Sequence, residues 1–131
     1  MTADLWTVFA ACILPYVPYM IVATFKWQRG IYDANNPRAS NDQLEGWSLR
    51  AKGAELNSWE ALASYLAVTF IAYQTPADRT LLASLGVAWV ASRLLYFTAY
   101  IAGKGGVRIL MWSIGIALML ARFGLAVTAG S

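Results

Sequence analysis

The chain has 131 residues, of which 59% are hydrophobic and 13% are charged, and its net charge is +3. A typical soluble domain is about 25% charged, so this composition predicts a membrane protein, and the length suits a single domain over residues 1–131. The sequence contains no histidine, which excludes His-based acid–base catalysis, haem ligation by histidine and most zinc sites. We therefore expect no metal site, and the single Cys12 cannot form an internal disulfide.

The first predicted helix covers residues 4–26 and spans the membrane. Leu5–Phe25 is apolar apart from two threonines, and its length is close to the roughly 20 residues that cross a bilayer. Pro15 and Pro18 interrupt this run, so we expect a kinked helix whose freed carbonyls are satisfied by neighbouring helices. The lack of a basic segment before the apolar run, together with Asp4, argues against a cleaved signal peptide.

The second predicted helix covers residues 44–74 and carries a polar row into its apolar half. Spacings of three, four and seven place this row on one helix face; it comprises Arg50, Gly53, Asn57, Glu60 and Ser64. An alternative is a shorter helix capped at Asn57, with Glu60 folded back on the first amides. We favour the long helix, because Ser58–Tyr73 has only 16 residues, somewhat short of a span. Lipid cannot solvate the row, so it marks a helix start or a site.

Two further membrane helices are predicted over residues 79–102 and 106–127. Both segments are apolar apart from hydroxyl groups and a few arginines. A tight turn at residues 75–78 precedes the third helix, and Asp78 is expected to cap it. The four segments together predict an all-α fold, a bundle of four transmembrane helices.

Arg93 is the second polar anomaly, because it lies inside the third apolar segment. Tyr96 and Tyr100 follow at helical spacing on the same face. One interpretation is structural: Arg93 snorkels, or pairs with Glu60 to hold the bundle together. The other is functional: Arg93, Glu60 and further arginines, including Arg108, lie at one depth, and the surplus of cations indicates an anionic ligand.

The basic residues also predict the orientation in the membrane. Seven of them flank the first and third loops and two lie on the opposite side; the seven are Lys26, Arg29, Arg38, Arg50, Lys52, Lys104 and Arg108, and the two are Arg79 and Arg122. By the positive-inside rule, the first and third loops are cytoplasmic and both termini are outside. This asymmetry explains the net positive charge without a nucleic-acid partner.

Several motifs resemble the MAPEG family, the membrane-associated proteins in eicosanoid and glutathione metabolism. The resemblance rests on Asn57-x-x-Glu60, on Arg93-x-x-Tyr96-x-x-x-Tyr100 and on Arg108 at the start of the fourth helix. A bacterial branch is indicated by Leu14-Pro15-Tyr16, Tyr32-Asp33-x-Asn35-Asn36-Pro37-Arg38 and Asn57-Ser58-x-Glu60-Ala61. The resemblance implies a left-handed four-helix bundle in the bacterial inner membrane, assembled as a homotrimer, with glutathione bound between subunits near the cytoplasmic face.

The resemblance also implies roles for individual residues. Arg108 is expected to be catalytic, because an arginine at this place activates the thiol in the family. The residues expected to bind glutathione are Asn57, Glu60, Arg93, Tyr96 and Tyr100, with Arg38 added from the first loop. The eicosanoid branch carries an arginine one turn before the asparagine, where this chain has Gly53, and Arg50 is expected to replace it in part.

The function that follows is a membrane-bound transferase or peroxidase that uses glutathione or a similar thiol. Its second substrate would be an apolar electrophile or a lipid hydroperoxide that enters from the surrounding lipid. Two alternatives stay open at this point. One is a non-catalytic membrane subunit of the same fold, which Gly53 favours. The other is a small proton-coupled exporter built around Glu60.

Overall fold

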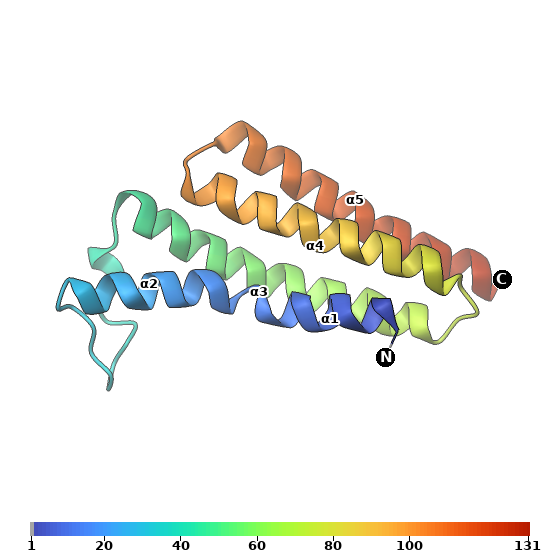
Figure 1. Cartoon of the computed structure of the whole chain (residues 1–131), viewed down its shortest axis with the longest axis horizontal. Helices are drawn as coiled ribbons and strands as arrows, with labels where there is room; N and C mark the ends of the chain where they lie inside the picture. Colours follow the sequence, from blue (N-terminus) through green and yellow to red (C-terminus); the bar gives the residue numbers. More distant parts are fainter. Residues whose placement is uncertain (1) are drawn as a thin grey trace.

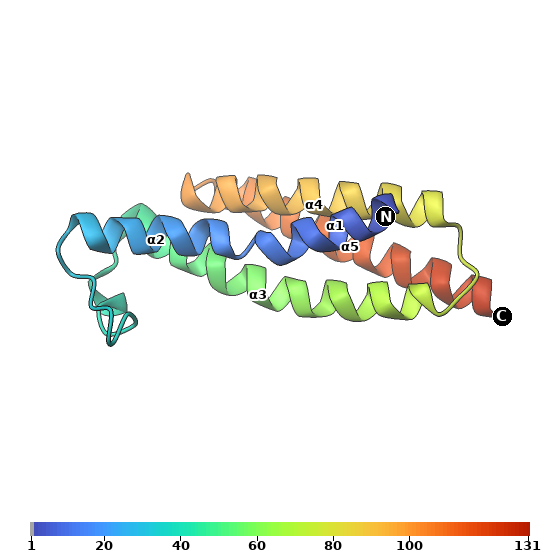
Figure 2. The same ribbon diagram turned by 60° about the horizontal axis from the view of Figure 1, so that its bottom comes forward.

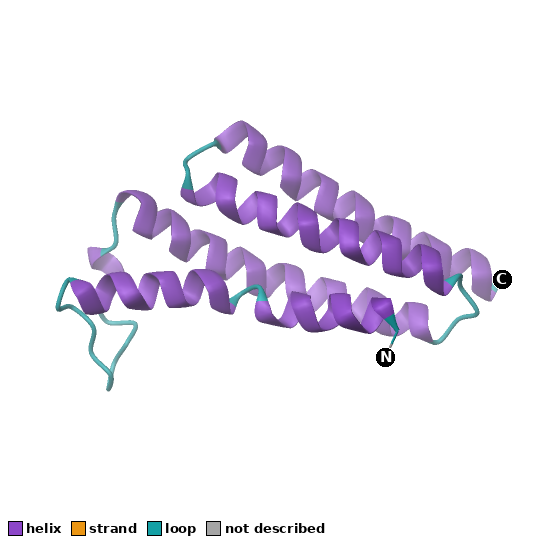
Figure 3. Cartoon of the chain, in the orientation of Figure 1, coloured by secondary structure: helices purple, strands orange, loops and turns teal. Residues whose placement is uncertain are grey.

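The computed structural model describes residues 2–131 and is all-helical (Figures 1 and 3). Its elements are α1 (Ala3–Ile13), α2 (Tyr16–Gln28), the short 3-10 helix η1 (Asn41–Gln43), α3 (Gly46–Tyr73), α4 (Arg79–Ile101) and α5 (Gly105–Gly130). Since α1 and α2 follow one another along one line, the chain forms a four-helix bundle (Figure 1). The predicted all-α fold class is confirmed.

The two ends of the bundle carry different parts of the chain. Both termini lie at the end where α3 passes into α4, and the loop between α2 and α3 lies at the opposite end (Figure 1). Along the bundle, α4 packs on α5, α1 packs on α4, and α2 packs on α3, as Figure 2 shows from a second side. The start of α3, the end of α4 and the start of α5 therefore lie at the loop end.

The predicted kink in the first membrane helix lies at Leu14 and Pro15, which separate α1 from α2. Proline has no backbone N–H, so the two prolines, Pro15 and Pro18, each remove one bond of the helical ladder. The N–H of Val17 donates instead to the Leu14 carbonyl three residues earlier, at 3.3 Å. The stretch Ala3–Gln28 nevertheless is long and apolar enough to cross a membrane, as are α4 and α5.

The predicted second membrane helix, α3, is continuous over 28 residues, but it is not among the three stretches of residues 2–131 that are long and apolar enough to cross a membrane. At 1.5 Å per residue the length of α3 is about 42 Å. Asn57 lies in the interior of α3, so the long-helix prediction is confirmed and the cap at Asn57 is excluded. The predicted cap of the third membrane helix is also present, because Asp78 Oδ1 accepts from the N–H groups of Thr80 at 2.8 Å and Leu81 at 3.1 Å.

A buried ion pair between α1 and α5 is linked by further hydrogen bonds to α3 and α4. Arg122 of α5 donates to Asp4 of α1 at 2.8 Å, and the two residues are 0% and 1% exposed. The same guanidinium donates to Thr69 of α3 at 3.0 Å and to the Leu82 carbonyl of α4. Arg122, which the sequence counts among the basic residues of the terminal side, lies about two turns before the end of α5 and is buried against Asp4.

Candidate functional site

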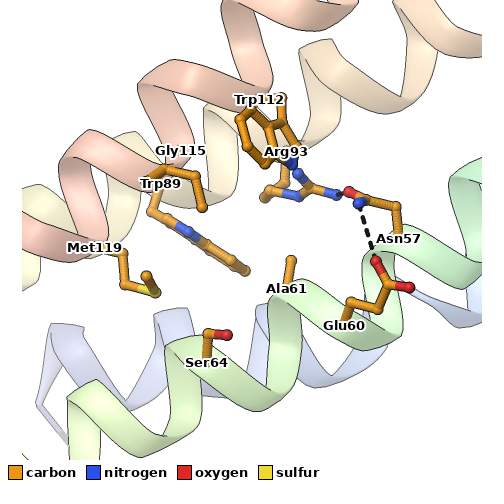
Figure 4. Close-up of a pocket in the computed structure, with 10 residues that line it drawn as sticks. Asn57, Glu60, Ala61, Ser64, Trp89, Arg93, Trp112, Gly115 and Met119 are labelled. Carbon is orange, nitrogen blue, oxygen red and sulfur yellow. Dashed lines mark hydrogen bonds between the residues drawn. The ribbon is translucent and has the colours of Figure 1, made fainter.

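A cavity of about 170 Å³ opens between α3, α4 and α5. One side is polar and comes mainly from α3, and the other is aromatic and apolar and comes from α4 and α5 (Figure 4). The lining residues are Asn57, Glu60, Ala61, Ser64, Trp89, Arg93, Trp112, Gly115, Ile116 and Met119. The predicted polar row of α3 therefore does face a cavity along its second half, from Asn57 to Ser64.

Asn57 links Arg93 to Glu60. Arg93 Nη2 donates to Asn57 Oδ1 at 2.7 Å, and Asn57 Nδ2 donates to Glu60 Oε2 at 3.3 Å (Figure 4). The direct Arg93–Glu60 ion pair expected from the sequence is not among the ion pairs of residues 2–131. The physical reason is that an amide supplies both an acceptor and donors, so Asn57 satisfies both charged groups at once. Glu60 itself stays exposed.

A ladder of cations and aromatic rings runs from this cavity toward the loop end. The Arg93 guanidinium lies 4.1 Å from the ring centre of Tyr96, and the Tyr96 and Tyr100 rings meet edge to face at 5.7 Å. The Arg108 guanidinium lies 4.7 Å from the ring centre of Tyr100. Arg108 is half-buried at the start of α5. The structure thus brings six predicted residues together: Asn57, Glu60, Arg93, Tyr96, Tyr100 and Arg108.

Gly53 of α3 packs closely against the Tyr100 side chain of α4. A Cβ placed at Gly53 would clash with the Tyr100 hydroxyl and lie 2.8 Å from its ring Cζ. The Tyr100 side chain of α4 therefore occupies the space that a side chain at position 53 of α3 would need. Arg50, one turn earlier, donates from Nε to the Ile101 carbonyl at 3.0 Å. Its guanidinium thus binds the carboxyl end of α4, where a cation is favourable, and the structure does not place it in the cavity.

Arg38 is not part of this cluster within one chain. It lies exposed in the first loop and lines a different cavity of about 180 Å³ between α2, α3 and that loop. Lys52 and Glu55 also line it and pair at 2.9 Å on the face of α3 opposite Asn57. Lys26 crosses this cavity and donates to the Pro37 carbonyl at 2.8 Å, so the loop is anchored to the bundle there.

Residues 3–128 match the MAPEG family. The chain belongs to the MAPEG family. MAPEG proteins include glutathione transferases and peroxidases and are typically trimeric membrane proteins, so this chain is an integral membrane protein of a commonly glutathione-dependent family. A comparison with curated proteins found no match. Within residues 2–131, no three His, Cys, Asp or Glu side chains gather where they could hold a metal ion.

The apolar wall of this MAPEG cavity was not predicted from the sequence. Trp89 lies one turn before Arg93 on α4, and Gly115 and Met119 lie one turn apart on α5. Helical spacing from Arg93 toward the N-terminus of α4 could have found Trp89. Gly115 and Met119 carry no polar signal, and only the packing of α5 against α4 brings them to the cavity.

Proposed function

We propose that this MAPEG protein is a membrane-bound transferase or peroxidase that uses glutathione or a similar small thiol. The observation that carries the proposal is the charge of the candidate site. Arg93 and Arg108 lie along one ladder, and neither takes part in an ion pair within residues 2–131. The carboxylate of the cavity lining, Glu60, is already bonded to Asn57. Such a surplus of cations in a half-buried place favours an anionic ligand.

The chemistry of glutathione fits these groups. It has one ammonium, two carboxylates and a thiol, so it needs one acceptor and several cationic donors. Glu60 would accept from the ammonium, and Arg93 would bind a carboxylate, because a guanidinium presents paired donors to it. Asn57 offers donors and an acceptor between them. Tyr96 and Tyr100 would contact the peptide from α4.

Arg108 would then set the chemistry of the thiol. An arginine stays protonated and cannot act as a base, but its charge beside sulfur favours the thiolate. Lowering a thiol pKa from about 8.5 to about 6.5 requires roughly 2.7 kcal/mol of differential stabilisation. A guanidinium that is half-buried against Tyr100 can supply interaction of this size, since water screens it less there.

The second substrate would be an apolar electrophile or a lipid hydroperoxide. Trp112 and Ile116 of α5 form part of the cavity wall and are themselves exposed on the outer surface of the bundle. In a membrane, that surface meets lipid or a neighbouring subunit. An apolar substrate would therefore reach the cavity sideways past α5, while the thiol would reach it from the loop end.

We also propose a homotrimer in which Arg38 completes the site of the adjacent subunit. Arg38 and the Asn57 cavity lie on opposite faces of α3 in one chain, so a single subunit cannot bring them together. Two copies packed side by side could, and residues 1–131 would form one domain of such an assembly. Native mass spectrometry in mild detergent should give a trimer, and a spectrum with monomers or dimers alone would contradict this.

The proposed orientation places the loop end in the cytoplasm and both termini outside, in a bacterial inner membrane. Burial of Arg122 strengthens the asymmetry of the basic residues, because it leaves only Arg79 as a flanking cation at the terminal end. In intact cells, Ala34→Cys in the first loop should resist a membrane-impermeant thiol reagent, and a cysteine at Ser131 should react. Labelling of position 34 from outside would reverse the proposed topology.

The test of the enzyme proposal separates binding from thiol activation. Arg108→Ala should keep most of the glutathione affinity measured by calorimetry, but lose the thiolate absorbance and turnover. Glu60→Ala should weaken binding itself. Lys104→Ala, an exposed cation in the same turn, is the matched control and should change neither. Wild-type turnover without any thiolate signal would contradict the role of Arg108.

A second candidate is a non-catalytic membrane subunit of the same fold. The observation that favours it is Gly53, because Tyr100 fills the place where the eicosanoid branch carries an additional arginine. Glutathione binding distinguishes the two candidates. A wild-type protein that binds no thiol at millimolar concentration would support the subunit and exclude the enzyme.

A further inference from the structure

A second polar cluster lies toward the opposite end of the bundle from Arg108, around the Asp4–Arg122 ion pair. Thr7, one turn after Asp4, is 5% exposed, and its hydroxyl donates to the Asp4 backbone carbonyl at 2.7 Å. The same hydroxyl lies 2.6 Å from the hydroxyl of Tyr65 on α3. A threonine hydroxyl has only one hydrogen, so Tyr65 is the donor in that bond.

Tyr65 is fully buried and its position is set from several sides. The Arg122 guanidinium lies 5.0 Å from the centre of its ring, and the Thr7 bond fixes the hydroxyl end. Gly86 of α4 lets these groups come close, because a Cβ there would lie 2.6 Å from Thr7 Oγ1, 2.9 Å from Arg122 Nη1 and 2.9 Å from the Tyr65 hydroxyl. Little room is left for the Tyr65 ring to tilt or slide.

The cluster also contacts the candidate site, because Tyr65 stacks on Trp89. The Tyr65 ring stacks on Trp89 with the ring centres 4.0 Å apart and the planes 20° from parallel. Trp89 is 3% exposed, and its indole forms a wall of the Arg93 cavity (Figure 4). A continuous series of contacts therefore runs from Asp4 through Thr7 and Tyr65 to the cavity.

We propose that Thr7 and Tyr65, held by the Asp4–Arg122 pair, are positioning residues that fix the Trp89 wall of the thiol cavity. Neither residue touches the cavity itself. Their effect passes through the stacked rings, because a shifted Tyr65 would leave Trp89 free to turn toward Arg93. The inference rests on the proposed thiol-binding function and adds two residues, on α1 and α3, that determine the shape of the site.

The test removes one hydroxyl at a time. Tyr65→Phe keeps the stacked ring but loses the bond to Thr7, and Thr7→Val removes the same bond from the other side. Tyr73→Phe is the matched control, since Tyr73 is also on α3 and its hydroxyl also pairs with an α1-end threonine, Thr2, at 2.9 Å. Protein labelled with 5-fluorotryptophan reports the Trp89 environment directly, with the resonance assigned by Trp89→Phe.

Two readouts are expected to change together. The fluorine resonance of Trp89 should shift or broaden in Tyr65→Phe and Thr7→Val. Glutathione affinity should fall, by about fivefold at most, because the variants remove one net hydrogen bond that positions the site and none to the ligand. Tyr73→Phe should change neither. An unmoved Trp89 resonance, or a moved resonance with wild-type affinity, would overturn the inference. If the wild type binds no glutathione, the proposed function fails; the Trp89 resonance of Tyr65→Phe and Thr7→Val still decides the positioning role, which an unmoved resonance overturns and a moved one supports.

Discussion

Arg122 and Arg93 are both buried arginines in the membrane bundle, but their partners differ. Arg122 meets the carboxylate of Asp4, a hydroxyl and a carbonyl, and is 0% exposed. Arg93 is 5% exposed, donates to the amide of Asn57 and lies against Tyr96 without a carboxylate of its own. The charge of Arg122 is neutralised inside the protein, whereas the charge of Arg93 is left available beside a cavity.

This difference separates a structural cluster from a ligand-binding one. An isolated charge in a membrane bundle is costly, so it is retained where it is paired or where it serves a ligand. The hydrogen bonds of the Asp4–Arg122 pair join four helices, and neither Asp4 nor Arg122 lines the Arg93 cavity. The Arg93 cluster faces that cavity directly. Substitutions in the Asp4–Arg122 cluster should therefore mainly lower stability, whereas substitutions in the Arg93 cluster should mainly lower ligand affinity.

The largest loss of stability is expected when the Asp4–Arg122 ion pair is broken. Asp4→Ala leaves the Arg122 guanidinium buried without its counter-charge, which should reduce the free energy of unfolding by about 3–5 kcal/mol. Denaturation with increasing SDS in mixed micelles measures this. Asp42→Ala, an exposed carboxylate in η1, is the control and should change stability by less than about 0.5 kcal/mol. Equal stability of the two variants would mean that the ion pair does not hold the bundle.

A smaller loss is expected from overpacking the same region. Gly86→Ala inserts a methyl group within 3 Å of Thr7, Arg122 and Tyr65, and should cost about 1–3 kcal/mol of unfolding free energy. Gly124→Ala on α5 meets nothing within 4 Å, so it should be neutral or stabilising by up to about 1 kcal/mol. The same SDS titration compares them. A stable Gly86→Ala variant would show that the cluster can expand without loss.

The smallest change in stability is expected in the Arg93 cluster. Gly53→Ala pushes on the outer part of the Tyr100 side chain, whose hydroxyl, Cζ and Cε1 are the atoms nearest to the new methyl group. Unfolding free energy should change by less than about 1 kcal/mol, but glutathione affinity should fall because Tyr100 and Arg108 move together. Gly105→Ala, which has open space around it, is the control for affinity. A large loss of stability in Gly53→Ala would make this region structural as well.

The sequence predicted the fold well, because its signals are local. Apolar runs of membrane length, Pro15 in the first of them and Asp78 before the third helix each act within a few residues. The continuous α3 followed from a length argument alone. These features do not depend on which helices pack against one another. The sequence therefore predicts the four-helix bundle without knowledge of its packing.

The site was predicted only in part, because its remaining features depend on packing between helices. Arg93 and Glu60 were expected to pair directly, and Asn57 stands between them. Arg122 was counted among the basic residues of the terminal side, but its pairing with Asp4, 118 positions away in the sequence, was not predicted. Helical spacing from Arg93 places Trp89 on the cavity face of α4, but it does not predict that Trp89 stacks on Tyr65 of α3. No spacing rule within one helix specifies contacts between helices.

Calorimetric titration of glutathione into the wild-type protein in lipid nanodiscs tests the central claim most directly. We expect saturable binding at millimolar concentration or below, and a thiolate absorbance that appears at lower pH than for free glutathione, whose thiol titrates near about 8.5. Arg93→Gln should abolish the binding, because it removes the charge but keeps a donor for Asn57. A wild-type protein that binds no glutathione would contradict the account of the Arg93 cluster as a thiol site.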